Sequence, residues 1–168
     1  REGIASVDAN IDDFKIVVEK KAEGIRFNDG KCDPAGRFWA GTIADDVKEG
    51  TASLYCLNTD LHLDLKIPKV TISNGLAWTA DHKKLYYIDT PTRQVVSYDY
   101  DIADGNIENK KVIIEIDQQM GFPDGMTMDE KGILYVAMWE GGKVVRINPI
   151  TGVLLDSIEV PGANLVTS

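Results

Sequence analysis

The sequence predicts an all-β protein that forms part of a β-propeller, and three observations carry this prediction. The chain shows no sustained helical period. A motif of an Asn-Gly or Asp-Gly step, a short apolar segment, a polar turn and a second apolar run occurs three times, starting at residues 29, 74 and 124. The starts are 45 and then 50 residues apart, a period that is typical of four-stranded propeller blades. The 168 residues hold roughly three and a half such units, so we expect a piece of a longer protein.

The clearest copy of the motif covers residues 123–139. Its polar turn, at residues 129–132, separates two runs of β-prone residues and therefore predicts a hairpin. This hairpin places Asp124 at the start of the innermost strand, where the side chain can face a cavity.

The strands follow from the same pattern. We expect residues 1–24 to end one blade, and residues 164–168 to start the last. Three blades lie between them, at residues 25–70, 71–118 and 119–163. Alternation of apolar and polar residues, as expected for half-buried antiparallel strands, places the strands at residues 4–8, 14–19, 31–33, 38–43, 53–58, 63–68, 76–79, 84–89, 95–99, 112–116, 126–129, 134–139, 143–148 and 154–160.

The composition excludes several classes of function. A formal net charge of −9 argues against nucleic acid, whose phosphates require Lys and Arg, and disfavours anionic membranes. Simple solubility explains most of this acidity. No apolar run approaches the ~20 residues of a membrane span. Cys32 and Cys56 form no zinc motif, so we expect reduced, packed thiols in a cytoplasmic protein, with a disulfide as the alternative.

Oxygen-bearing side chains stand just before the expected innermost strands. These are Asn28 or Asp29, Asn74 and Asp124, and innermost strands converge on the propeller axis. Such hard ligands suit Ca²⁺, Mg²⁺ or Mn²⁺ better than an ion that prefers thiolates. The alternative is that Asn-Gly and Asp-Gly are ordinary turn dipeptides.

The sequence contains few residues or motifs that indicate any other kind of site. Arg26 lies beside the same mouth and could clamp an anion or a carbonyl, although a solvated Arg explains it equally well. The chain has no Ser/His/Asp arrangement, Gly-rich phosphate loop or HExxH motif. We expect the aromatic residues that recur at equivalent places in the blades to be core; they are Trp39, Trp78, Trp139, Tyr86, Tyr87 and Tyr135.

Three ordered motifs resemble the SMP-30/gluconolactonase/LRE family. The first is residues 26–31 with 33–37 and 40–42, the second is residues 73–78 with 86–89, and the third is residues 123–126 with 135–137 and 141–146. The resemblance runs over nearly the whole chain. It implies a six-bladed propeller, of which this chain would supply the middle.

The resemblance also implies a site. One divalent ion would sit on the axis, with Asn74 and Asp124 among its ligands; a family Glu ligand has no counterpart here. Arg26 and Asn28 would face the substrate, together with Asp46 in place of a longer Glu. Asn28 stands one residue before Asp29, the strict equivalent in the repeat.

The favoured hypothesis is therefore metal-dependent hydrolysis of a sugar lactone by a monomer, with Asp124 as catalytic base and Ca²⁺, Zn²⁺, Mn²⁺ or Mg²⁺ as cofactor. Three alternatives remain: a calcium-binding regulatory protein of the regucalcin type, a luciferin-regenerating or arylester hydrolase, and a plain interaction scaffold. We expect the 168 residues alone to be inactive, because Asp124 by itself compensates a buried divalent ion poorly.

Overall fold

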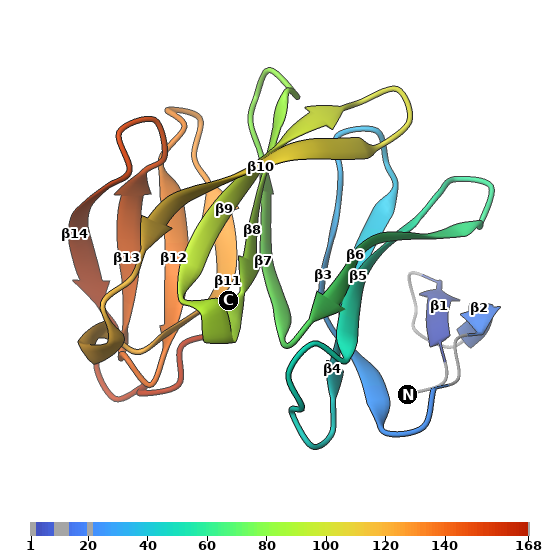
Figure 1. Ribbon diagram of the computed structural model, residues 1–168, viewed down its shortest axis with the longest axis horizontal. Coiled ribbons are helices and arrows are strands. Elements are labelled where there is room, and N and C mark those ends of the chain that lie inside the picture. The colour runs from blue at the N-terminus through green and yellow to red at the C-terminus, as the bar shows by residue number, and fades with distance from the viewer. Residues whose placement is uncertain (1–2, 9–13, 20–21, 168) are drawn as a thin grey trace.

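Three four-stranded antiparallel sheets follow one another in the computed structural model, which describes residues 3–8, 14–19 and 22–167 (Figure 1). A two-stranded sheet precedes them. In chain order the strands are β1 (Gly3–Val7), β2 (Phe14–Glu19), β3 (Ile25–Cys32), β4 (Phe38–Ala44), β5 (Ala52–Leu57), β6 (Leu63–Val70), β7 (Ser73–Trp78), β8 (Lys84–Asp89), β9 (Gln94–Asp101), β10 (Asn106–Glu115), β11 (Phe122–Met128), β12 (Leu134–Trp139), β13 (Lys143–Asn148) and β14 (Val153–Glu159).

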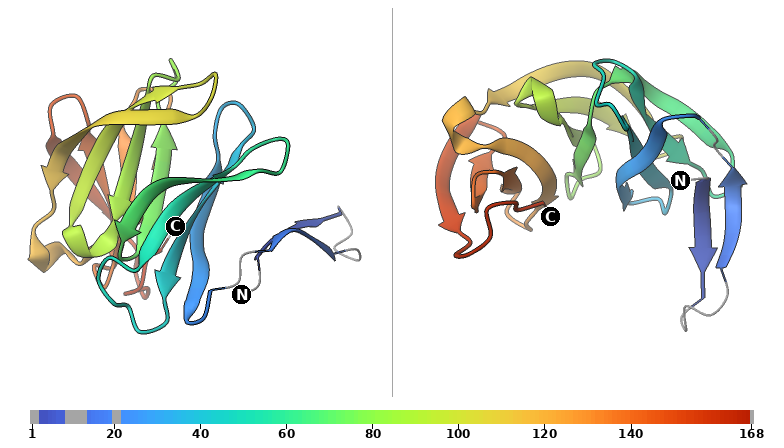
Figure 2. Two further views of the ribbon diagram at one scale, coloured as in Figure 1. Left: turned by 45° about the vertical axis from the view of Figure 1, so that its right-hand side comes forward. Right: turned by 90° about the horizontal axis from the view of Figure 1, so that it is seen from below.

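Each sheet is a simple meander, in the orders β3-β4-β5-β6, β7-β8-β9-β10 and β11-β12-β13-β14. The first strand of the middle sheet, β7, contacts both β3 and β11, and the sheets follow one another in an arc (Figure 2). This is the architecture of a partial β-propeller, as predicted. The hairpin expected at residues 129–132 is present between β11 and β12.

The innermost strands start earlier than predicted. We expected them to begin at residues 31, 76 and 126, whereas they begin at Ile25, Ser73 and Phe122. Each contains a bulge, because two residues on the innermost strand oppose one on its neighbour between the paired residues. The polar motif residues therefore lie inside the strands and not before them.

Aromatic side chains pack between the first two blades. Trp39, Trp78 and Tyr100 meet edge to face, with ring centroids 5.7 to 6.3 Å apart. Trp39, Tyr86 and Tyr87 are buried as expected. Trp78, Tyr135 and Trp139 are only half-buried, and Trp139 lines a pocket.

A buried polar cluster joins the same two blades. Asp33 accepts hydrogen bonds from Arg37 Nε (2.7 Å), Trp39 Nε1 (3.0 Å) and Tyr100 Oη (2.7 Å). Arg37 continues to the carbonyl of Ile102 in the next blade (2.8 Å). Although burial opposes ionisation, these hydrogen bonds hold the pKa of Asp33 below its usual value.

The two cysteines differ from the expectation in one respect. Both are free, and Cys56 is buried, with burial raising its thiol pKa to about 11. Cys32, which we expected to be packed, is the last residue of β3 and is exposed.

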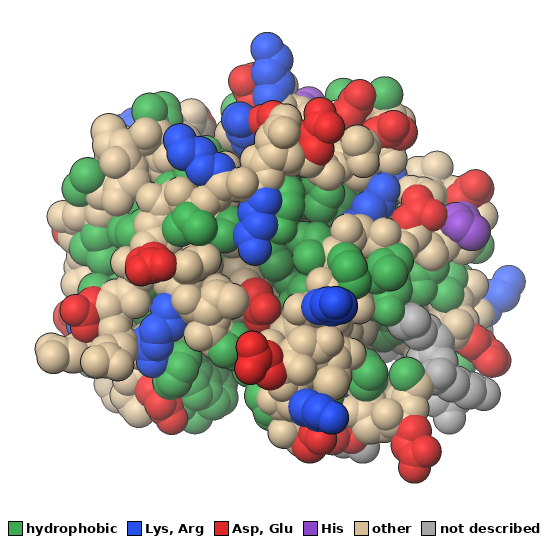
Figure 3. Space-filling model, in the orientation of Figure 1, with side chains coloured by type: hydrophobic (Ala, Val, Ile, Leu, Met, Phe, Trp, Pro, Cys, Tyr) green, Lys and Arg blue, Asp and Glu red, His purple; other side chains and the backbone are tan. Residues whose placement is uncertain are grey.

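Two short 3₁₀ turns interrupt the strands, at Thr90–Thr92 (η1) and Gln118–Met120 (η2). Among the described residues, no helix has the length and apolar character that crossing a bilayer requires. Acidic and basic side chains are interspersed on the face that Figure 3 shows. Parts of the expected 1–24 and 164–168 segments, namely residues 1–2, 9–13, 20–21 and 168, lie outside the described residues.

Candidate functional site

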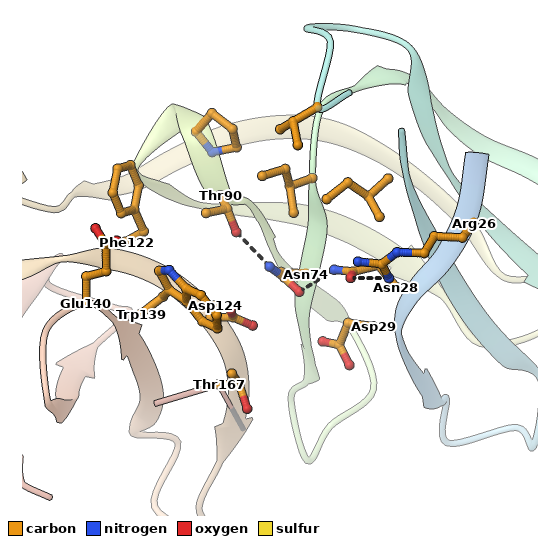
Figure 4. A pocket seen from close by; sticks show the side chains of 14 residues that line it. Arg26, Asn28, Asp29, Asn74, Thr90, Phe122, Asp124, Trp139, Glu140 and Thr167 are labelled. Carbon is orange, nitrogen blue, oxygen red and sulfur yellow. Dashed lines mark hydrogen bonds between the residues drawn. The ribbon is translucent and has the colours of Figure 1, made fainter. Parts of the chain in front are cut away.

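A pocket of about 700 Å³ opens beside the three innermost strands, a volume within the ~300–1,000 Å³ of small-molecule sites. Polar side chains make its floor, and apolar ones make much of its wall (Figure 4). The lining residues are Arg26, Asn28, Asp29, Ile43, Val47, Ile72, Asn74, Thr90, Pro91, Phe122, Asp124, Trp139, Glu140 and Thr167.

The bulges bring three motif residues to equivalent places. Asn28, Asn74 and Asp124 each follow directly after the last paired residue before the bulge. Spacing of the dipeptides alone had aligned Asp29 with Asn74. The backbone register aligns Asn28 instead, and its Nδ2 donates to Asn74 Oδ1 across 2.9 Å.

Thr90 fixes the orientation of Asn74. The buried Asn74 amide donates through Nδ2 to Thr90 Oγ1 (2.8 Å), and Thr90 Oγ1 donates to the carbonyl of Pro123 (2.8 Å). Since the nitrogen end is held by Thr90, the Oδ1 end is directed to Asn28 and the pocket. The Pro123 carbonyl directly precedes Asp124, so one hydroxyl links two site residues.

The pKa of the Asp124 carboxyl lies well above the usual value for Asp. Burial raises its pKa to about 6, and the negative charge of Asp29 adds to the effect, while the backbone amide of Gly125 opposes it. Burial also raises the pKa of Asp29. Two partly buried carboxylates thus share one pocket.

Lys31 lies outside the pocket lining, but its charge interacts with that of Asp29. Its Nζ donates to the carbonyl of Met126, 2.7 Å away, and thereby ties β3 to β11. Burial lowers the pKa of Lys31, and the charge of Asp29 partly restores it. Lys31 belongs to the first sequence motif, but its position in the motif did not predict a role in the site.

Of the residues expected to bind substrate, two line the pocket and one does not. Arg26 Nη1 donates to Asn28 Oδ1 (3.2 Å) and to the carbonyl of Phe27 (3.1 Å). Asp46 is exposed and is absent from the lining, and its carboxylate accepts a hydrogen bond from the backbone amide of Lys48. Its neighbour Val47 faces the pocket in its place.

The oxygen donors in the pocket are of the chemical type that binds a hard divalent cation. Asn74 Oδ1 and the Asp124 carboxylate are oxygen donors of the type that Ca²⁺ and Mg²⁺ take, and a cation would relieve the repulsion between Asp124 and Asp29. The described residues contain no group of three or more His, Cys, Asp or Glu side chains placed to hold an ion. Any complete ligand set must therefore include amide or backbone oxygens, or donors outside this chain.

Sequence reasoning missed several lining residues. Thr90 and Glu140 directly follow a strand whose neighbour carries a motif residue, and Phe122 begins the strand that carries Asp124. These positions were the available signal. For Thr167, the sequence predicted only that it lies in the segment 164–168 that starts a further blade. Its carbonyl accepts a hydrogen bond from Gly125 N (2.7 Å), which brings residue 167 beside β11.

Comparison with known proteins matches all of this chain to one family model. The model, described as the SMP-30/Gluconolactonase/LRE-like region, covers residues 1–168. YvrE of Bacillus subtilis, named as a candidate sugar lactone lactonase, is 46% identical over 139 residues, which are 83% of this chain and 48% of YvrE. Regucalcin of Sus scrofa is 42% identical over 149 residues, which are 86% of this chain and 50% of regucalcin.

The fold has solved counterparts. A regucalcin from Agrobacterium tumefaciens, described as a calcium-binding protein, superposes with a TM-score of 0.90 at 25% identity, over 97% of this chain and 56% of that structure. The chain thus spans about half the length of the curated relatives that it matches.

Proposed function

Because the chain belongs to the SMP-30/gluconolactonase/LRE-like family, we propose that the protein containing it hydrolyses a sugar lactone with the help of one divalent metal ion on the propeller axis. The observation that carries the proposal is the convergence of Asn28, Asn74 and Asp124 from equivalent bulges onto one pocket. The three residues lie inside strands and not in turns, which argues against the alternative that they belong to ordinary turn dipeptides.

Asn74 and Asp124 would hold the metal ion, which when bound supplies a Lewis acid for the lactone carbonyl. The remaining chemistry falls to the side chains. Asp124, whose carboxylate lines the pocket, would act as the general base. It would accept a proton from the attacking water, either directly or through a second water.

The proton that the attacking water loses would be returned to the leaving group. The water oxygen bonds to the lactone carbonyl carbon, the ring C–O bond breaks, and the proton taken by Asp124 passes to the departing ring oxygen. The product is an open-chain hydroxy acid. Arg26 and Asn28 would hold substrate oxygens during this step, so that binding energy is spent on orientation.

The test is hydrolysis of glucono-δ-lactone by the full-length protein in a pH-stat, with EDTA and with Ca²⁺, Zn²⁺ or Mn²⁺ added back. We expect the activity to follow the metal and to fall at least 100-fold in Asp124→Asn, in line with the effect of general bases. Glu130→Gln, in the exposed turn that ends the same strand, is the matched control and should retain activity.

A calcium-binding regulatory role is the second candidate, favoured by the description of the Agrobacterium tumefaciens relative as calcium-binding. It uses the same oxygen donors. Tight Ca²⁺ binding that depends on Asp124, without turnover of any lactone, would move the assignment to this role. Turnover of an arylester or an oxidised luciferin in place of sugar lactones would identify a different hydrolase of the family.

A further inference from the structure

One wall of the pocket is formed by apolar side chains from three separate segments. In Figure 4 the four lining residues without labels gather above Asn74. They are Ile43, Val47, Ile72 and Pro91. Ile43 and Ile72 pair as an isolated β-bridge, and Thr90 N donates to the carbonyl of Ile72 (3.1 Å), which places Pro91 beside them.

Val47 is held in this wall against its own backbone preference. Its φ is 52°, in the left-handed region that a β-branched residue rarely adopts. The surrounding loop enforces the conformation: Val47 N donates to the carbonyl of Ala44 (2.9 Å), and Gly50 N to Thr71 Oγ1 (3.2 Å). Strained backbone of this kind is concentrated at ligand clamps.

Val47 also remains 47% exposed while it lines the pocket. An apolar side chain that is this exposed in the pocket lining can still be covered by a ligand. The hydroxyl groups of a free sugar would find no hydrogen-bond partner among the side chains of Ile43, Val47, Ile72 and Pro91, so their desolvation would be uncompensated.

We propose that Val47 is a specificity-determining residue, and that the wall it forms with Ile43, Ile72 and Pro91 binds an apolar substituent of the lactone. The inference rests on the proposed lactonase function and extends its substrate class from free sugar lactones to lactones that carry an alkyl substituent. The polar floor at Asn28, Asn74 and Asp124 receives the ester group, and the wall receives the apolar substituent.

The test compares kcat/KM for δ-decalactone, which has an alkyl chain on the lactone ring, with that for unsubstituted δ-valerolactone, in the full-length protein. We expect a preference of at least tenfold for the alkyl lactone, since even one methylene in a hydrophobic pocket is worth about 10–200-fold. Val47→Asn should reduce this preference about tenfold. Because Asn tolerates a left-handed backbone, the Tm should not fall.

Leu61 offers a matched control. It has a φ of 67° and is 51% exposed, but lies in the turn between β5 and β6, away from the pocket lining. Leu61→Asn relieves the same kind of strain and should leave the substrate preference unchanged. A general effect of strain relief would appear in both variants.

The outcomes separate this inference from the function on which it rests. Hydrolysis of glucono-δ-lactone and δ-valerolactone without a preference for δ-decalactone overturns the inference and leaves the lactonase function standing. An unchanged preference in Val47→Asn also overturns it. If none of the three lactones is hydrolysed, the proposed function fails and the inference fails with it.

Discussion

The side-chain nitrogen of Asn28 lies 2.9 Å from the side-chain oxygen of Asn74, and this hydrogen bond joins the innermost strands of two neighbouring blades. Asn28 Nδ2 also donates to the carbonyl of Ser73 (3.1 Å). The contact orients both amides, because the opposite end of Asn74 is bound to Thr90. The site is therefore held together by polar contacts between blades as well as by the strands themselves.

Replacement of Thr90 tests this orientation. Thr90→Val keeps the shape of the side chain but removes the hydroxyl that bridges Asn74 and Pro123, and it leaves a buried amide nitrogen unpaired. We expect the affinity for Ca²⁺, measured by calorimetry, to fall about 10–100-fold, as when an outer partner of a metal ligand is lost. The exposed neighbour Thr92→Val should have little effect, and an equal loss in both variants would contradict the role given to Thr90.

Replacement of Gly75 tests whether β7 and β11 must approach each other closely. A Cβ at this position would lie 2.8 Å from both the Asp124 carbonyl oxygen and the Met126 Cβ, closer than such atoms approach. Gly75→Ala should therefore lower the free energy of unfolding by about 1–3 kcal/mol and reduce lactone turnover by displacing Asp124. In Gly132→Ala the new Cβ meets nothing within 4 Å, so only its positive φ should cost stability and the turnover should persist.

The Asp33–Arg37 pair predicts an acid-sensitive contribution to stability. The pKa of Asp33 is lowered in the folded state, so its contribution is fully present above the unfolded value of about 3.9 and is lost as the pH falls through the lowered folded value. Asp33→Asn leaves buried Arg37 without its partner and should cost about 3–5 kcal/mol near neutral pH.

Denaturant unfolding of the wild type and Asp33→Asn at pH 7 and at pH 3 checks the prediction. The difference between the two proteins should shrink at the lower pH. The exposed Asp60→Asn serves as the control. A difference that does not change with pH would assign the loss to packing and not to charge.

Residues 1–168 expressed alone should show no metal-dependent hydrolysis of lactones. The described residues contain no group of three or more His, Cys, Asp or Glu side chains placed to hold an ion. In addition, β14 exposes Val153, Leu155 and Ile158, which gives an apolar strand that favours self-association. Size-exclusion chromatography and the pH-stat assay test both parts. Monomeric protein with measurable turnover would overturn this prediction.

Much of the fold could be predicted from sequence because a blade is a local structure. Hairpins depend on neighbouring residues, so the turn at residues 129–132 and the strand pairing it produces were correctly predicted. The site was less accessible. Asn74 and Asp124 were identified as candidates from their motifs, whereas Thr90 contributes a hydroxyl from a short 3₁₀ turn that no periodicity indicates.

The repeat, the fold class and the oxygen-rich chemistry at the start of each unit can be predicted from the sequence, because they depend on residue type and spacing along the chain. Which residue of each unit faces its neighbour depends on how the strands pair and the blades pack. A bulge adds one residue to each innermost strand, and in a strand a shift of one residue moves a side chain to the opposite face. For this reason Asn28 meets Asn74. Val47 lines the pocket in place of Asp46 because the loop after β4 turns there in a left-handed conformation.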